Sequence, residues 1–115
     1  MLIFAGLAVA ALPSGCARPT HDRATLAAIR TESLTLMQAH PTNMNNPLPK
    51  EDWPRVIASL QPTFVDVGQE GVDIIMKPGF DGGYGYFVPK IGQELPGPPK
   101  GYSKLDNGIY WYRSY

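Results

Sequence analysis

Two aspartates, Asp66 and Asp73, are the residues of this chain whose types and spacing suit them to do chemistry together. They flank residues 68–71, which begin and end with glycine and favour a tight turn. If Val67 pairs with Val72 across that turn, the two carboxylates stand directly opposite each other on one face of a hairpin. A carboxylate pair can bind a cation or share a proton in acid–base catalysis. A solvated pair without a function is the alternative interpretation.

Tyrosine is the other residue type whose distribution suggests a function. The chain has six tyrosines, and this side chain combines apolar area with a polar tip, which suits the recognition of proteins or sugars. Tyrosines of the predicted strands are expected to line one outer face beside Ile75, namely Tyr84, Tyr86, Tyr110 and Tyr112. We expect Tyr86 to lie near the centre of this patch. The alternative is that strands simply favour tyrosine and that the first helix covers this face.

A central hairpin positions most of these residues. Its arms cover residues 72–77 and 84–89, and the segment between them is rich in Pro, Gly and Asp, as turns are. An uninterrupted register pairs Ile74 with Phe87. Because side chains alternate across a sheet, the predicted core face carries Val65, Val72, Ile74, Met76, Phe87 and Pro89. The predicted outer face carries Asp66, Asp73, Ile75, Lys77, Tyr84, Tyr86 and Val88.

Two helical segments are expected to pack on this sheet. The first runs from about Arg23 to Ala39 and follows Asp22, whose carboxylate can cap the first turn. The second begins near Trp53 and is stopped by Pro62. Both carry apolar residues at helical spacing, which predicts one buried face on each helix.

The remaining strands complete the predicted fold. Residues 63–67 and 109–113 are β-rich, whereas residues 91–104 contain several prolines and are expected to form a crossover loop. The sequence therefore predicts a single α+β domain over residues 23–115. In it, two helices pack on an antiparallel sheet of about four strands.

The first segment of the chain resembles a targeting signal. Residues 1–12 are almost purely apolar, with the length of the apolar region of a secretory signal. With Gly15 and Cys16 after them, they resemble a bacterial lipoprotein signal, in which the cysteine is lipidated and becomes the mature N-terminus. The resemblance implies that residues 1–15 are a signal peptide, that lipid such as palmitate is attached at Cys16, and that residues 16–22 are a tether to the membrane.

The same resemblance implies a location in the bacterial cell envelope, facing the periplasm or the outer surface. Ala17 stands where the family's retention signal has an acid, which implies the outer membrane in a cell with two membranes. The alternatives are an ordinary signal cut after Ala10, with Cys16 left as a free thiol, and a buried helix in a cytosolic protein. Cys16 is the only cysteine, and a lone thiol in an oxidising compartment is better explained by lipidation.

Composition narrows the classes of function. Ten basic and ten acidic residues balance, so nucleic acid is not favoured as a partner. Only two histidines are present, in the tether and at a helix end, so no metal site or cofactor is predicted. The sequence favours a non-catalytic binding or accessory module with a protein or glycan partner, of which an immunity protein that blocks a toxin is one form. The alternatives are a small envelope hydrolase using Asp66 and Asp73, and a purely structural lipoprotein.

Overall fold

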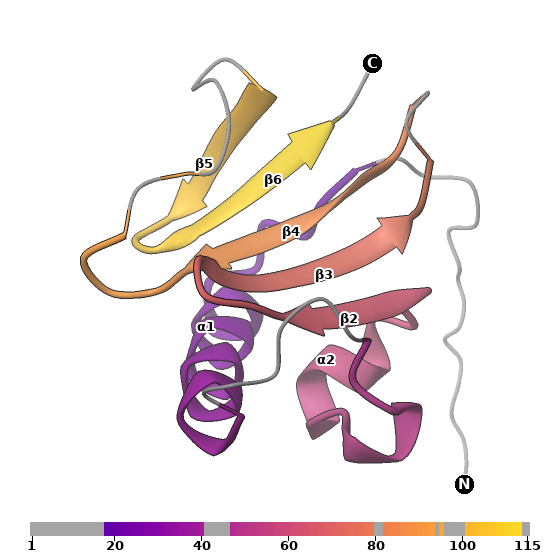
Figure 1. Cartoon of the computed structure of the whole chain (residues 1–115). Helices are drawn as coiled ribbons and strands as arrows, with labels where there is room; N and C mark the ends of the chain where they lie inside the picture. Colours follow the sequence, from indigo (N-terminus) through magenta and orange to yellow (C-terminus); the bar gives the residue numbers. More distant parts are fainter. Residues whose placement is uncertain (1–17, 41–46, 80–81, 94, 96–100, 114–115) are drawn as a thin grey trace, which may run out of the picture.

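The protein folds into two layers, a five-stranded antiparallel sheet and two helices packed on one of its faces (Figure 1). The fold is α+β, as predicted, with five strands where about four were expected. The expected signal segment and Cys16 lie outside the described residues. The structure is a computed structural model, which describes residues 18–40, 47–79, 82–93, 95 and 101–113.

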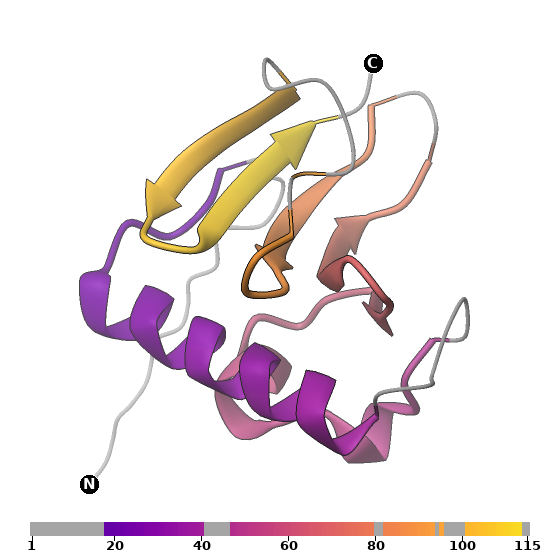
Figure 2. The same ribbon diagram turned by 60° about the vertical axis from the view of Figure 1, so that its left-hand side comes forward.

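The longer helix, α1 (Arg23–Ala39), begins and ends where the sequence predicts. The Asp22 side chain accepts a hydrogen bond from the backbone N–H of Thr25 at 2.9 Å. This bond satisfies one of the donors that the first turn leaves free. Figure 2 shows α1 running along one side of the sheet. The helix buries Leu26, Ile29, Ser33 and Leu36.

The shorter helix, α2 (Arg55–Ser59), begins two residues later than Trp53, where we expected it to start. The reason is the backbone of Pro54, which is extended (φ −65°, ψ 163°) rather than helical. A separate 3-10 turn, η2 (Lys50–Asp52), precedes it. Among the described residues, no helix combines the length and the apolar character that a membrane crossing requires.

A side chain of α1 caps α2. The Glu32 carboxylate accepts hydrogen bonds from the backbone N–H groups of Val56 and Ile57, at 3.0 and 2.9 Å. These groups belong to the first turn of α2 and have no partner within that helix. Because the acceptor is charged, each bond is stronger than one between neutral groups. Glu32 therefore fixes the two helices to each other beneath the sheet.

The sheet has the strand order β2-β3-β4-β6-β5. Its strands are β2 (Phe64–Val67), β3 (Gly71–Lys77), β4 (Tyr84–Pro89), β5 (Tyr102–Asp106) and β6 (Ile109–Arg113). β5 was not predicted, because its first residues fall in the stretch that was expected to be a crossover loop. A turn at Gly108, which has a φ of 73°, joins β5 to β6. The strand after this turn, β6, was predicted, whereas the strand before it was not.

The first hairpin has the predicted register. Val67 pairs with Val72 and Asp66 with Asp73. The two aspartates therefore stand directly opposite each other on neighbouring strands, as the turn at residues 68–71 indicated.

The register of the central hairpin corrects the prediction. Lys77 pairs with Tyr84 as expected, but a bulge follows, so that Ile75 pairs with Gly85 and Ile74 with Tyr86. A bulge places one extra residue on one strand. As a result, every residue of β4, Tyr84 included, lies on the face opposite to the one predicted, because side chains alternate along a strand. The predicted pairing of Ile74 with Phe87 is therefore wrong.

The bulge decides which face of the sheet each residue of β4 occupies. On the helix-covered face, buried side chains from all the inner strands and β2 form the core with α1 and α2: Val65, Val67, Val72, Ile74, Tyr86, Val88, Ile109 and Trp111. We call the opposite side the open face, because both helices lie on the other side (Figure 2). It carries Phe64, Asp66, Asp73, Ile75, Gly85, Phe87, Tyr102, Lys104, Tyr110 and Tyr112.

Candidate functional site

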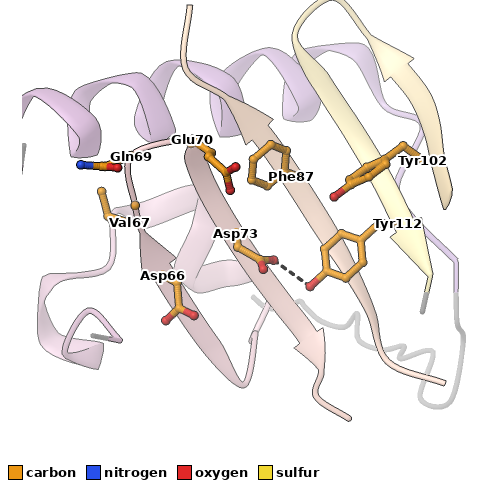
Figure 3. A pocket seen from close by; sticks show the side chains of 10 residues that line it. Asp66, Val67, Gln69, Glu70, Asp73, Phe87, Tyr102 and Tyr112 are labelled. Carbon is orange, nitrogen blue, oxygen red and sulfur yellow. Dashed lines mark hydrogen bonds between the residues drawn. The ribbon is translucent and has the colours of Figure 1, made fainter. Parts of the chain in front are cut away.

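A pocket of about 400 Å³ lies on the open face (Figure 3). Every strand of the sheet contributes at least one residue to its lining, and the turn between β2 and β3 closes one end. The pocket is lined by Asp66, Val67, Gly68, Gln69, Glu70, Gly71, Asp73, Phe87, Tyr102 and Tyr112. We call this set the open-face pocket. It brings the predicted carboxylate pair together with one of the four predicted tyrosines, Tyr112.

The carboxylates of the pocket come from one hairpin. Asp66 on β2 and Asp73 on β3 are cross-strand neighbours, and Glu70 lies in the turn between these strands. One carboxylate oxygen of Asp66, Oδ1, is buried and accepts no hydrogen bond from the described residues. A buried acceptor without a donor costs free energy, and within the described part of the chain this oxygen has no donor.

A tyrosine from the other half of the sheet reaches this pair. The Tyr112 hydroxyl donates a hydrogen bond to Oδ1 of Asp73 at 2.7 Å, drawn as the dashed line in Figure 3. Tyr112 lies on β6, and β4 runs between β6 and β3. Its ring can cross β4 because Gly85, its partner on that strand, has no side chain. A Cβ at Gly85 would lie 2.9 Å from the Tyr112 hydroxyl oxygen.

Burial and like charge shape the titration of these groups. Burial raises the pKa of Asp73 to about 6, although the Tyr112 hydrogen bond opposes the rise; the Asp66 charge adds to it. Burial also raises the pKa of Asp66. The pKa of Tyr112 is raised by burial and then by the Asp73 charge, so its hydroxyl stays protonated and remains a donor. At neutral pH Asp73 is therefore mostly ionised.

Aromatic rings form the other wall of the pocket. Phe87 on β4 is only 6% exposed, although it lies on the open face. Its ring packs edge-on against Tyr102, with centroids 6.1 Å apart, and Tyr102 lies 6.2 Å from Tyr112. The pKa of Tyr102 is raised by burial and then by the charges of Asp73 and Glu70. The negative charges of these two carboxylates therefore favour the protonated form of the Tyr102 hydroxyl.

Two of the predicted tyrosines are on the other side of the sheet. Tyr86 is 3% exposed; its ring packs edge-on against Trp111 at 5.0 Å, and its hydroxyl accepts a hydrogen bond from the Thr20 backbone at 2.9 Å. Tyr84 packs beside Trp111 on the same side, at 5.5 Å. The prediction of Tyr86 as the centre of an exposed patch is therefore wrong, because the bulge turns it toward the helices.

Two other predicted residues are on the open face but outside the pocket. Tyr110 lies next to the pocket and packs edge-on against Tyr102, with centroids 6.4 Å apart. Ile75 is half-buried on β3. Neither lines the pocket.

Seven of the ten lining residues were not predicted as site residues. Three of them were missed for different reasons. Phe87 was assigned to the core by the uninterrupted register, and Tyr102 was assigned to a loop. Glu70 was seen only as part of a turn, yet its place between the two predicted aspartates is a signal that was present in the sequence.

The pocket combines hydrogen-bond acceptors with ring surface. Its lining contains three carboxylates and no Lys, Arg or His. Within the described part of the chain, no three His, Cys, Asp or Glu side chains are placed to hold a metal ion. The arrangement suits a ligand that donates hydrogen bonds and stacks on aromatic rings.

Comparisons of the chain with protein-family models, with curated proteins and with solved structures find no match.

Proposed function

We propose that this protein is a non-catalytic binding module whose ligand site is the open-face pocket. The observation that carries the proposal is the pocket itself, a concavity with polar acceptors and aromatic rings on a sheet face that the helices leave uncovered. Protein binding sites concentrate tyrosines in such places, because the ring supplies contact area at low entropic cost. The partner is a protein, and an immunity protein that blocks a toxin is one form this function takes.

The proposal includes a membrane anchor. Support comes from the sequence, in which Gly15 and Cys16 follow an apolar run as in lipoprotein signals. Lipid on Cys16 would hold the domain at the surface of a membrane of the bacterial envelope. Labelling with radioactive palmitate tests this part: wild type should be labelled and Cys16→Ser should not. Equal labelling of both, or of neither, contradicts it.

Site-specific photocrosslinking tests the binding function. A photoreactive amino acid replaces Gln69, which is exposed at the pocket, or Ala58, which is exposed on α2 and serves as the matched control. In cells that produce the chain, the probe at position 69 should yield one discrete adduct and the probe at position 58 should not. If both positions give the same products, or position 69 gives none, the pocket is not the binding site.

A second candidate function, a small hydrolase, is favoured by the pKa of Asp73. A carboxyl group with a pKa of about 6 can give or take a proton near neutral pH, and Asp66 beside it supplies a second carboxylate. The candidate predicts hydrolysis of envelope peptides or glycans that is lost in both Asp66→Asn and Asp73→Asn. Absence of turnover by wild type across such substrates excludes it and leaves the binding module.

A further inference from the structure

The open-face pocket has a strong excess of acceptors over donors. When ionised, Asp66, Glu70 and Asp73 can accept hydrogen bonds but cannot donate them. Oδ1 of Asp66 accepts none from the described residues. Tyr112 has one hydroxyl proton, which it donates to Asp73. The side-chain donors left in the lining are the Tyr102 hydroxyl and the Gln69 amide. A ligand that fits this site must therefore bring its own donors.

The charge of the lining points the same way. Three carboxylates share a pocket with no basic side chain, and the negative charges of Asp73 and Glu70 are felt at Tyr102. In Figure 3 the carboxylates of Glu70 and Asp73 lie on one side of the pocket, opposite the rings of Tyr102 and Tyr112. An anion is excluded by this charge. A neutral sugar needs donors as well as acceptors from its site, and the lining has few donors.

The aromatic rings of the pocket favour a guanidinium group over an ammonium group. Aromatic ring faces attract positive charge. A guanidinium group is planar, stacks on rings and offers a fork of N–H donors that matches a carboxylate, whereas an ammonium is a compact and strongly hydrated charge. Phe87, Tyr102 and Tyr112 provide the rings, and the pocket volume of about 400 Å³ accommodates one long side chain.

We propose that the open-face pocket receives an arginine side chain of a partner protein. Its guanidinium lies between the acidic residues of the β2–β3 hairpin and the aromatic rings of the pocket: Asp66, Glu70 and Asp73 on one side, Phe87, Tyr102 and Tyr112 on the other. The inference rests on the proposed binding function and specifies the chemistry of its ligand. The carboxylates of this hairpin accept from the guanidinium, and Glu70 is the most exposed of them. The rings of Tyr102 and Phe87 contact its face or its aliphatic stem.

Nuclear magnetic resonance titration of the isotope-labelled full chain in detergent micelles tests this chemistry. The probe is Nα-acetyl-arginine methylamide, and the matched neutral probe is the corresponding citrulline derivative, which has nearly the same shape without the charge. The arginine probe should shift the amide signals of residues 66–73, 102 and 112 and saturate. The citrulline probe should bind at least about tenfold more weakly than the arginine probe, because it cannot form the charge-assisted hydrogen bonds.

Charge variants give the second arm of the experiment. Glu70 is exposed in a turn, so Glu70→Gln should fold normally and should weaken binding of the arginine probe about fivefold to tenfold. The matched control is Glu51→Gln, an exposed acid on η2 outside the pocket, which should leave the affinity unchanged. Equal binding of the arginine and citrulline probes, or an equal effect of the two variants, overturns the proposal.

Other outcomes separate this inference from the proposed function. If a lysine derivative or a methyl glycoside shifts the pocket signals more strongly than the arginine probe does, the arginine assignment is wrong while the binding function stands. If no probe shifts these signals but the crosslinker at position 69 still captures a discrete partner, the arginine assignment is again overturned. If the crosslinker captures nothing, the binding function itself fails.

Discussion

Replacing Asp73 by Asn should stabilise the domain at neutral pH and leave it nearly unchanged in acid. The pKa of Asp73 rises from 3.8 to about 6 on folding, chiefly because of burial. One pH unit of difference in pKa is worth about 1.36 kcal/mol, so ionisation of this carboxyl in the folded protein costs about 3 kcal/mol. Asn has a similar shape, cannot ionise, and keeps a carbonyl oxygen as acceptor for the Tyr112 hydroxyl.

The direction of the pH dependence follows from proton binding. The folded state holds the Asp73 proton more tightly than the unfolded chain does, so the stability that this group contributes is fully present below pH 3.8. That stability is lost as the pH rises toward about 6. The stability advantage of Asp73→Asn over wild type should therefore grow by about 3 kcal/mol across this window.

Urea denaturation of wild type and Asp73→Asn at about pH 3.5, 5 and 7.5 measures this difference, and subtraction removes the other titrating groups that both proteins share. Glu51→Gln is the control, since Glu51 is an exposed acid outside the pocket. A stability difference between wild type and Asp73→Asn that does not change with pH would refute the reasoning, because it would mean that Asp73 is not desolvated by the fold.

Three further substitutions test the packing that supports the site. Glu32→Ala should lower the free energy of unfolding by about 2–3 kcal/mol in urea denaturation, because it leaves two N–H groups of α2 without their charged acceptor. Ser33→Ala should raise the free energy of unfolding by about 1 kcal/mol, because the Ser33 hydroxyl is fully buried and has no hydrogen-bond partner among the described residues. A loss of stability in this variant would contradict the expectation and would mean that the hydroxyl has a partner. Gly85→Ala should destabilise the sheet and displace Tyr112, because the added Cβ meets the carbonyl oxygen of Ile74 and the Tyr112 hydroxyl; an unchanged Tyr112 signal in a nuclear magnetic resonance spectrum would contradict this.

Local signals predicted much of the fold. The bounds of α1 follow from the Asp22 cap and from Pro41, and the first hairpin follows from the glycines at the ends of its turn. Both are decided by residues close together in the chain. The carboxylate pair was predicted for the same reason, because its geometry depends only on that hairpin.

The rest depends on features that no local pattern contains. A single extra residue in the bulge after Ile75 moves each side chain of β4 to the face opposite to the predicted one. Tyr86 therefore joins the core cluster in the place predicted for Phe87. An uninterrupted register looked equally consistent, since both faces of β4 carry large apolar side chains. The capping of α2 by Glu32 joins residues 24 positions apart. The contact between Tyr112 and Asp73 spans 39 positions and crosses an intervening strand.

The central claim is that the open-face pocket, rather than the sheet face as a whole, binds the partner. Two neighbouring tyrosines test it most directly: Tyr102 lines the pocket, and Tyr110 packs against it from outside. The measurement is the affinity of the purified chain for the partner captured at position 69, with Tyr102→Ala and Tyr110→Ala compared after both are shown to be folded. Tyr102→Ala should weaken binding about thirtyfold, as for a central aromatic anchor worth about 2 kcal/mol, and Tyr110→Ala should change it by less than about threefold. Equal losses, or a larger loss for Tyr110→Ala, would contradict the account.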